Sequence, residues 1–340
     1  MSAIAVRKVG KSKAEVTKMG LGGAPLGDLF HVLDEDQAQG VLQAAWDAGI
    51  RYYDTAPFYG YGKSEHRVGH FLRQQKPEEY ILSTKVGRVL TAVRDRENFD
   101  GGFWAGGLPF EVRFDYSYDG IMRSFEDSLQ RLGVNAVDLL LIHDLDFWFH
   151  QTEAGVNAYL SQLFSSGWRA LDELRSSGQI KGVGAGINEM GMMPRFLDLV
   201  DLDFFIVALP YTLLDQEVLD EEFPRCAEHG VGAVIGAVFA SGILATGAVE
   251  GATYAYAPAT EEILEKTRRI EAVCKRHDTP LGAAAMQFPL AHPIVAAIIP
   301  GALAPAHVQG NVQLLAHPIP TDLWAELKDE GLLRKDAPTP

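Results

Sequence analysis

The sequence predicts an α/β fold, a (β/α)8 TIM barrel with a closed parallel sheet and long loops after its third and fourth strands. Short apolar or β-branched runs alternate with longer amphipathic runs, which is the signature of repeated βα units. Eight such pairs follow one another between residues 18 and 315, and eight is the number that a closed barrel needs. We therefore expect a single barrel domain that spans residues 1–340.

The first unit begins with a strand at 18–21, and its helix begins at Asp34, where Asp34 and Gln37 have the spacing of a capping pair. Gly49 ends this helix. The later strands are expected at 51–53, 80–84, 136–142, 182–185, 204–208, 232–237 and 295–299. The later helices are expected at 65–73, 118–132, 168–176, 192–200, 216–228, 260–277 and 305–315.

The first turn reads Gly20-Leu-Gly-Gly-Ala-Pro25 and has some likeness to a dinucleotide-binding fingerprint. An open, doubly wound sheet begins its first helix directly at these glycines. Here Pro25 follows them and no helical pattern begins there. We therefore favour the closed barrel over the open sheet.

Two connections are too long to be simple turns, namely 86–117 and 144–167. Both are rich in aromatic residues. Long loops in a compact domain are usually lids or binding loops, and these two follow strands, on the face where barrel enzymes keep their active sites. Ordered surface packing is the alternative.

Composition and charge restrict the function. The chain is 47% hydrophobic, has a net charge of -15 and contains no run that approaches the ~18 apolar residues of a membrane span. The negative charge repels nucleic acid and anionic lipid. Cys226 and Cys274 lack the spacing of a disulfide framework or a metal site, so neither is expected. We expect a cytoplasmic protein whose partner is a small molecule.

Four residues of complementary chemistry follow predicted strands: Asp54, Lys85 and His143 stand immediately after their strands, and Tyr59 lies in the loop that Asp54 begins. Any one of them has an alternative interpretation as a helix cap or loop anchor. Hydride exchange at a carbonyl or alcohol carbon needs a proton donor or acceptor at the oxygen, and Tyr59 suits this role if its pKa falls. We expect Lys85, paired with Asp54, to lower that pKa. We expect His143 to hold the substrate oxygen.

Three segments resemble the aldo-keto reductase family. They are Asp54-Thr-Ala-Pro-Phe-Tyr59-Gly-Tyr-Gly-Lys-Ser-Glu65, Ser83-Thr-Lys85 and Asp138-Leu-Leu-Leu-Ile-His143. The resemblance implies a barrel that binds NAD(P) in an extended form at its C-terminal face, with the four residues above as the catalytic group.

The resemblance also implies which residues bind the cofactor. They are Gly22, Gly23, Asp54, Asn188, Phe239, Ser241, Gly242, Leu244, Gly301, His307 and Asn311. The family pattern Gly-Val-Ser-Asn is replaced here by Gly182-Val-Gly-Ala-Gly-Ile-Asn188, so Asn188 is the expected substitute for the pair that holds the carboxamide. Ala208 stands where the family usually carries Gln.

Cofactor preference depends on the segment 299–311. Members that strongly prefer NADP carry Lys and Arg where this chain has Gly301 and His307. The 2′-phosphate of NADP is bound by charge-assisted hydrogen bonds, each contributing about 1.5–3 kcal/mol. We therefore expect NAD, with NADP less favoured.

Two further segments, 211–215 and 287–293, most resemble the branch of the family that contains pyridoxal and aldose dehydrogenases. The resemblance implies oxidation of a cyclic hemiacetal, pyridoxal or an aldose such as L-fucose, to its lactone. Phe58, Trp104 and Trp148 are the expected substrate contacts. Pro210 stands where sugar-oxidising members often carry Arg, which leaves pyridoxal competitive with a sugar.

Two other functions are open. One is an NADPH-dependent aldehyde or ketone reductase of the same family, which differs in cofactor and direction. The other is a binding module similar to a channel β-subunit, which a basic or hydrophobic docking segment would favour.

Overall fold

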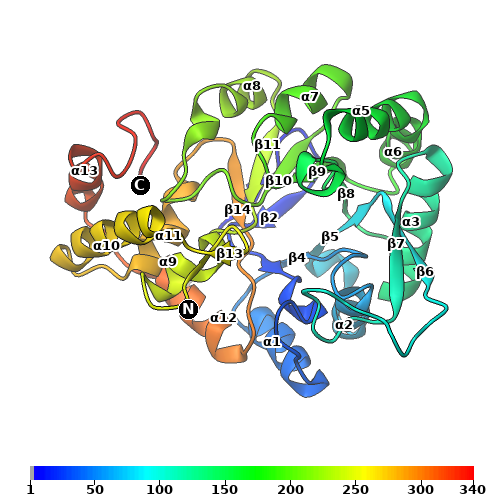
Figure 1. Cartoon of the computed structure of the whole chain (residues 1–340), viewed down its shortest axis with the longest axis horizontal. Coiled ribbons are helices and arrows are strands. Elements are labelled where there is room, and N and C mark those ends of the chain that lie inside the picture. Colours follow the sequence, from blue (N-terminus) through cyan, green and yellow to red (C-terminus); the bar gives the residue numbers. More distant parts are fainter. Residues whose placement is uncertain (1–3) are drawn as a thin grey trace.

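The computed structural model describes residues 4–340, and its main sheet has eight parallel strands in the order β14-β11-β10-β9-β8-β5-β4-β3. These strands are β3 (Leu21–Gly22), β4 (Tyr52–Asp54), β5 (Ile81–Val86), β8 (Leu139–His143), β9 (Gly182–Ile187), β10 (Phe204–Val207), β11 (Gly232–Ile235) and β14 (Val295–Ile298). Parallel bridges from Met19 to Ile298 and from Gly22 to Gly301 join the two edges. The sheet therefore closes into the predicted barrel (Figure 1).

Helices surround this barrel (Figure 1). They are α1 (Glu35–Asp47), α2 (Lys63–Leu72), α3 (Tyr118–Leu132), α6 (Trp168–Ser176), α7 (Met192–Leu199), α8 (Glu222–Glu228), α10 (Glu261–Arg276), α11 (Leu281–Leu290), α12 (Pro305–Ala316) and α13 (Thr321–Asp329). The predictions for α3 and α6 are confirmed to the residue, and α11 and α13 were not predicted. Within the described part of the chain, no helix is long and apolar enough to cross a membrane.

The predicted cap of α1 is confirmed in one of its two bonds. The Asp34 carboxylate accepts the N–H of Gln37 at 2.7 Å. The Gln37 side chain does not return this bond but donates to the carbonyl oxygen of Leu303 at 2.6 Å. Gln37 thus connects the start of α1 to the segment that precedes α12.

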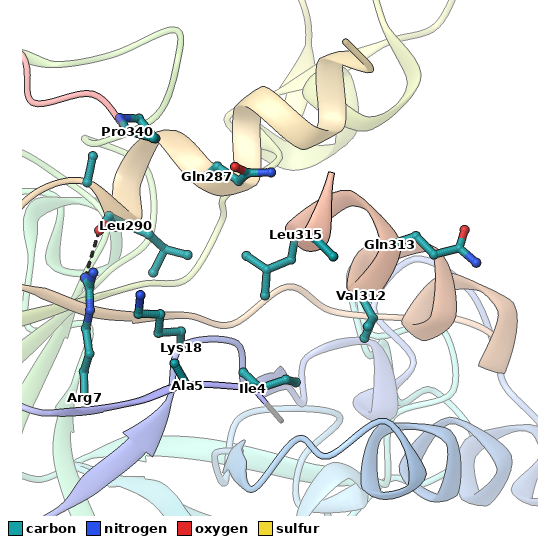
Figure 2. A pocket seen from close by; sticks show the side chains of 12 residues that line it. Ile4, Ala5, Arg7, Lys18, Gln287, Leu290, Val312, Gln313, Leu315 and Pro340 are labelled. Atoms are coloured by element: carbon teal, nitrogen blue, oxygen red, sulfur yellow. Dashed lines mark hydrogen bonds between the residues drawn. The ribbon is translucent and has the colours of Figure 1, made fainter. Parts of the chain in front are cut away.

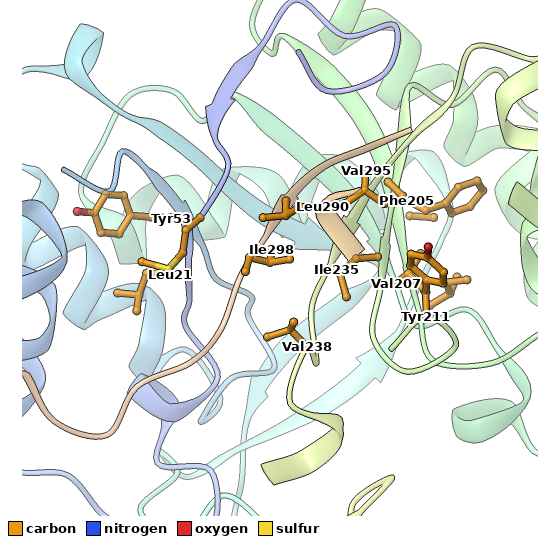
Figure 3. Close-up of a cluster of buried hydrophobic side chains, with 14 of the residues drawn as sticks. Leu21, Tyr53, Phe205, Val207, Tyr211, Ile235, Val238, Leu290, Val295 and Ile298 are labelled. Carbon is orange, nitrogen blue, oxygen red and sulfur yellow. The ribbon is translucent and has the colours of Figure 1, made fainter. Parts of the chain in front are cut away.

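Strand residues alternate between the barrel interior and the outer layer under the helices. On β8, Leu139 and Leu141 belong to the interior cluster, whereas Leu140 and Ile142 belong to the outer cluster. Figure 3 shows part of the outer layer, including Tyr53. Because side chains alternate with a period of two, the last residue of β8 points inward.

A hairpin closes the N-terminal end of the barrel. It consists of β1 (Val6–Lys8) and β2 (Glu15–Thr17), and its residues Val9 and Val16 pack in the interior cluster. At its turn, Gly10 has φ +49, and a Cβ there would lie 1.9 Å from the carbonyl oxygen of Asp203, just before β10. Only glycine fits this close approach of the two backbones. Because the hairpin covers the N-terminal end of the barrel, the active site is expected at the C-terminal end.

Both long connections after the third and fourth barrel strands are confirmed, but each carries regular structure. The first contains an antiparallel hairpin of β6 (Arg88–Ala92) and β7 (Phe110–Phe114). The second contains α4 (Phe147–His150), α5 (Glu153–Gln162) and a π-helix at Leu163–Gly167. A third hairpin, β12 (Thr253–Tyr254) with β13 (Ala257–Pro258), follows the short helix α9 (Ile243–Thr246).

Candidate active site

Three of the four predicted catalytic residues belong to barrel strands. Asp54 ends β4, Lys85 is the second-last residue of β5 and His143 ends β8. The prediction that they stand just after their strands was wrong by one or two residues, because these strands begin and end later than expected. Each has the parity of the interior side chains, as His143 does relative to Leu141. Tyr59 lies in the turn after β4.

The structure brings the four residues together. Lys85 Nζ lies 2.7 Å from Asp54 Oδ2 and 3.0 Å from the Tyr59 hydroxyl oxygen. Ser83 donates to the other carboxylate oxygen of Asp54 at 2.7 Å. The ring centres of Tyr59 and His143 are 5.7 Å apart. Asp54, Lys85 and His143 are each only 2% exposed.

The Lys85 ammonium uses all three of its protons within this group. Besides Asp54 and Tyr59, it donates to the carbonyl oxygen of Thr55 at 3.0 Å. Since Tyr59 accepts from Lys85, the proton of its own hydroxyl is left for another acceptor. The geometry therefore suits Tyr59 to proton exchange with a substrate oxygen.

The expectation that the pKa of Tyr59 lies below its ordinary value was wrong for the protein alone. Burial raises the pKa of the phenol well above its ordinary value, Asp54 and Asp144 raise it further, and Arg88 opposes them. The main physical reason is burial, which disfavours the charged phenolate. In addition, Asp54 at 2.7 Å balances the charge of Lys85, so this pair offsets little of the cost of burial.

His143 is neutral in this environment. Burial lowers the pKa of His143 well below its ordinary value, and the nearby cations of Arg88 and Lys85 add to this effect. A neutral imidazole has one N–H donor and one acceptor nitrogen. His143 is thus able to donate a hydrogen bond to a substrate oxygen without carrying charge.

Sequence reasoning missed a buried ion pair in the same site. Arg88, the first residue of β6, is 1% exposed and donates to Asp144 Oδ2 at 2.7 Å. Asp144 directly follows His143 in the chain. The available signals were a charged residue at the start of an aromatic-rich connection and a carboxylate beside the predicted histidine.

The predicted substrate residues differ in how they are presented. The Phe58 ring lies 6.2 Å from His143 and 5.4 Å from Trp104. Trp104 is only 3% exposed and lies 5.6 Å from the Tyr59 ring, so it supports its neighbours more than it offers a free surface. Trp148 is 39% exposed.

Tyr256, in the β12–β13 hairpin, is a further aromatic residue that the sequence did not single out. Its ring meets the edge of Trp148 at 5.6 Å between centres. Tyr256 is 42% exposed. Trp148 and Tyr256 thus approach each other from two connections at the C-terminal end of the barrel.

Gly22 and Gly23, predicted to bind cofactor, have a packing reason of their own. A Cβ on Gly22 would lie 2.6 Å from the carbonyl oxygen of Ile299, and one on Gly23 would lie 2.6 Å from that of Asp54. Both contacts are shorter than side chains tolerate, so the barrel itself requires glycine at these positions.

The segment that includes Phe239, Ser241 and Gly242 forms a tight turn. Ala240, Ser241 and Gly242 have φ values of +47, +64 and +116. The N–H groups of Ala240 and Gly242 donate to the carbonyl oxygens of Ala237 and Phe239 at 2.7 and 2.9 Å, so Ser241 is the residue of this turn whose N–H could meet a ligand. Leu244 is not brought to this surface, since its side chain is fully buried and its N–H donates to Phe239 at 3.1 Å.

Asn188 lies beside His143, but its amide N–H groups are already engaged. They donate to Asp144 Oδ1 at 3.0 Å and to Asp146 Oδ2 at 2.9 Å. Its amide oxygen remains as the acceptor for a carboxamide. Ala208, just after β10, donates its backbone N–H to Ile187 and has no polar side chain to replace the missing Gln.

The start of α12 fits a phosphate-bearing ligand. Ala304 caps this helix without a polar side chain. Pro305 has no N–H and that of His307 donates to the carbonyl oxygen of Ala304 at 3.0 Å, so of the first three helical residues Ala306 has the N–H that could meet an anion. His307 Nδ1 accepts the N–H of Leu303 at 3.3 Å, and Asn311 lies one turn further along the same face. A Cβ on Gly301 would lie 2.6 Å from the Pro25 side chain, so a lysine there would require rearrangement.

A cavity of about 620 Å³ lies away from this group of residues. Figure 2 shows it beside Arg7 of the N-terminal hairpin and the last turn of α11, where Arg7 donates to the carbonyl oxygen of Leu290. Lys18 and Gln287 also line it. These residues precede barrel strands, which sets the cavity at the N-terminal end, opposite the predicted site.

Comparisons with known proteins cover almost the whole chain. The aldo/keto reductase family model matches residues 18–330. A pyridoxal 4-dehydrogenase from Microbacterium luteolum is 43% identical over 338 residues, which are 96% of this chain and 97% of that protein. A D-threo-aldose 1-dehydrogenase from a Pseudomonas species is 38% identical over 96% of each chain. The solved holo structure of an aldo-keto reductase from Bacillus halodurans has a TM-score of 0.75, 26% identity and 97% coverage of both chains.

Proposed function

Because the chain belongs to the aldo/keto reductase family, we propose that it oxidises a cyclic hemiacetal to its lactone, with NAD as hydride acceptor. The predicted resemblance is confirmed, and with it an NAD(P)-dependent oxidoreductase. The observation that carries the proposal is the Asp54–Lys85–Tyr59 group, in which hydrogen bonds of 2.7 and 3.0 Å leave the phenol proton free.

In this mechanism the hemiacetal loses a proton from its hydroxyl and a hydride from the same carbon, and a lactone carbonyl forms. NAD, when bound, supplies the hydride acceptor and a positively charged ring. The positive charge of bound NAD would lower the pKa of Tyr59. The Tyr59 phenolate would then accept the proton of the hemiacetal hydroxyl. His143 donates a hydrogen bond to the same oxygen. Lys85 stabilises the phenolate, and Asp54 keeps Lys85 charged in a buried place.

We propose pyridoxal, in its hemiacetal form, as the first candidate substrate. The relative from Microbacterium luteolum is named for pyridoxal, and the rings of Phe58, Phe149 and Trp104 lie around the site. Aromatic side chains favour a flat ring through stacked or edge contacts. An aldose is the second candidate, because a relative at 38% identity is named for one.

A substrate panel tests the proposed function. We expect NADH to form from NAD with pyridoxal, and more slowly with L-fucose and other aldoses, since the aromatic surroundings offer little to a polyhydroxylated ring. The measurement is NADH absorbance during steady-state turnover, with the lactone identified by mass spectrometry. Reduction of aldehydes by NADPH with no oxidation of any hemiacetal would favour the reductase alternative instead.

Cofactor preference is a second prediction. We expect a higher kcat/KM with NAD than with NADP, because Gly301 brings no cation and His307, whose Nδ1 accepts the N–H of Leu303, has only Nε2 left for a ligand. His307→Arg adds a fixed positive charge. We expect it to lower the ratio of kcat/KM with NAD to kcat/KM with NADP by about tenfold or more.

The matched control is His317→Arg, which adds the same charge at the other end of the same helix. It is expected to leave the NAD to NADP ratio of kcat/KM unchanged. Equal use of both cofactors by the unmodified enzyme would contradict the argument.

A further inference from the structure

Arg88 is held in the active site by aromatic rings and one carboxylate. Its guanidinium carbon lies 3.9 Å from the ring centre of Phe149 and 4.1 Å from that of Phe58. Its Nη2 donates to Asp144 Oδ2 at 2.7 Å. A buried charge is tolerated when it is paired and hydrogen-bonded. Asp144 is therefore the group that compensates Arg88 in this apolar setting.

The carboxylate of Asp144 contacts three side chains. Oδ2 receives Arg88 and lies 3.2 Å from Nε2 of His143, and Oδ1 accepts from Asn188 at 3.0 Å. The backbone of Asp144 has φ +44, a left-handed conformation that aspartate tolerates better than most residues. Its N–H donates to the carbonyl oxygen of Gly186 at 3.1 Å. The turn after β8 thus brings this carboxylate back against His143.

These contacts decide which nitrogen of His143 carries the proton. Nδ1 is buried and meets no hydrogen-bond partner among residues 4–340, so a proton there would be an unsatisfied buried donor. Nε2 lies 3.2 Å from a carboxylate oxygen. A carboxylate attracts an N–H and repels a nitrogen lone pair. Both effects favour the tautomer with the proton on Nε2.

We propose that Asp144 is a positioning residue that holds His143 in the Nε2–H tautomer, and that Arg88 keeps Asp144 in place. The inference rests on the proposed role of His143 as hydrogen-bond donor to the substrate oxygen. The approach of Nε2 to Asp144 at 3.2 Å is electrostatic and not an aligned hydrogen bond, so the Nε2–H can still point to that oxygen. Asn188 is oriented by the same carboxylate, so one ion pair arranges both neighbours. An ion pair that only fastened the β6–β7 hairpin would not need to contact His143.

The Arg88–Asp144 pair also predicts that turnover falls at acidic pH. Burial raises the pKa of Asp144 to about 6, Arg88 and Lys85 oppose this, and Asp146 adds to it. The titratable and charged groups around Asp144 are Tyr59, Lys85, Arg88, Tyr116, His143, Asp146 and Tyr256. Because the carboxylate becomes neutral as the pH falls through about 6, we expect turnover to fall there.

Asp144→Asn tests the role of the carboxylate. It preserves the side-chain shape and removes the charge, so we expect kcat to fall by about a hundredfold through lost alignment, with little change in KM for NAD. The acidic limb of the pH profile should disappear. A variant that keeps the limb near its original pH would overturn the proposal.

Arg88→Met tests the role of the guanidinium, because it predicts the direction in which the acidic limb of the pH profile moves. The cation that lowers the pKa of Asp144 is removed, so the acidic limb should move to higher pH, by about one to three units. Arg88→Lys keeps the positive charge, so its acidic limb should lie close to that of the unmodified enzyme. The matched control is Arg175→Met, which breaks the pair of Arg175 with Asp203 at the N-terminal end of β10 and should leave the limb unmoved. An unmoved limb in Arg88→Met contradicts the proposal.

The tautomer of His143 can be measured by NMR without substrate, so this test of the inference does not depend on the proposed function. In protein labelled with nitrogen isotope at histidine, the His143 signals are assigned by their loss in His143→Gln. We expect the Nε2–H tautomer in the unmodified protein and a mixture with the Nδ1–H form in Asp144→Asn. Identical His143 spectra in both proteins would overturn the proposal, whatever the substrate of the enzyme.

Discussion

Phenylalanine at position 59 is expected to abolish turnover while NAD still binds. In the structure the Tyr59 hydroxyl oxygen accepts from Lys85 at 3.0 Å, which leaves its proton for the substrate. Tyr59→Phe removes this donor and acceptor but keeps the ring, so we expect a loss of at least about a thousandfold in both directions. The measurements are steady-state oxidation and reduction, together with a fluorescence titration of NADH.

Tyr61→Phe is the matched control for this variant. Tyr61 stands in the same turn, but its hydroxyl donates to the carbonyl oxygen of Gly101 at 3.4 Å, away from Lys85. We expect its activity to stay within a few fold of the unmodified enzyme. Activity of Tyr59→Phe within tenfold of the unmodified enzyme would reject Tyr59 as the proton-exchanging group.

The closed barrel and the assembly of the four residues were predictable from local pattern. A barrel brings the C-terminal ends of all its strands to one face, so Asp54, Lys85 and His143 had to converge once their strands were identified. Alternation also determines that they point inward, because each shares parity with an interior residue such as Leu141.

The Arg88–Asp144 pair was not predictable in the same way. Its partners are 56 residues apart, and Arg88 begins a β6–β7 hairpin that resembles a loop in sequence. The raised pKa of Tyr59 was missed for a related reason. It depends on burial and on which carboxylates surround the phenol, and the sequence identifies the Asp54–Lys85 pair without showing that the phenol is buried or that Asp144 lies near it.

Two of the unpredicted helices, α11 and α4, lack the signals that define the others. α11 is apolar on all sides and contains Pro289, so it shows no amphipathic period. It is buried among the barrel, α10 and α12, where continuous apolar character is suitable. The four residues of α4 are too few to show a period at all.

Lys85→Met is expected to slow oxidation by about a hundredfold or more near neutral pH. Lys85 and Asp54 are both 2% exposed and 2.7 Å apart, so losing the ammonium leaves a buried carboxylate beside the phenol. Asp54 already raises the pKa of Tyr59 and Arg88 lowers it, so without Lys85 the nearest cation no longer offsets the effect of Asp54. Oxidation needs the phenolate, so its pH profile should move to higher pH. Reduction uses the protonated phenol and should lose less.

The double variant Asp54→Asn/Lys85→Met separates charge from geometry. Removing the unpaired carboxylate should bring the pH profile of oxidation part of the way back, so that the two substitutions are not additive. Lys181→Met, which breaks a pair with Asp138 before β8, is the control and should leave the profile unchanged. We would measure kcat/KM for hemiacetal oxidation across the neutral and alkaline range. If Lys85→Met has the profile of the unmodified enzyme, a group other than Tyr59 must titrate, because no nearby phenol could lose this cation and keep its pKa.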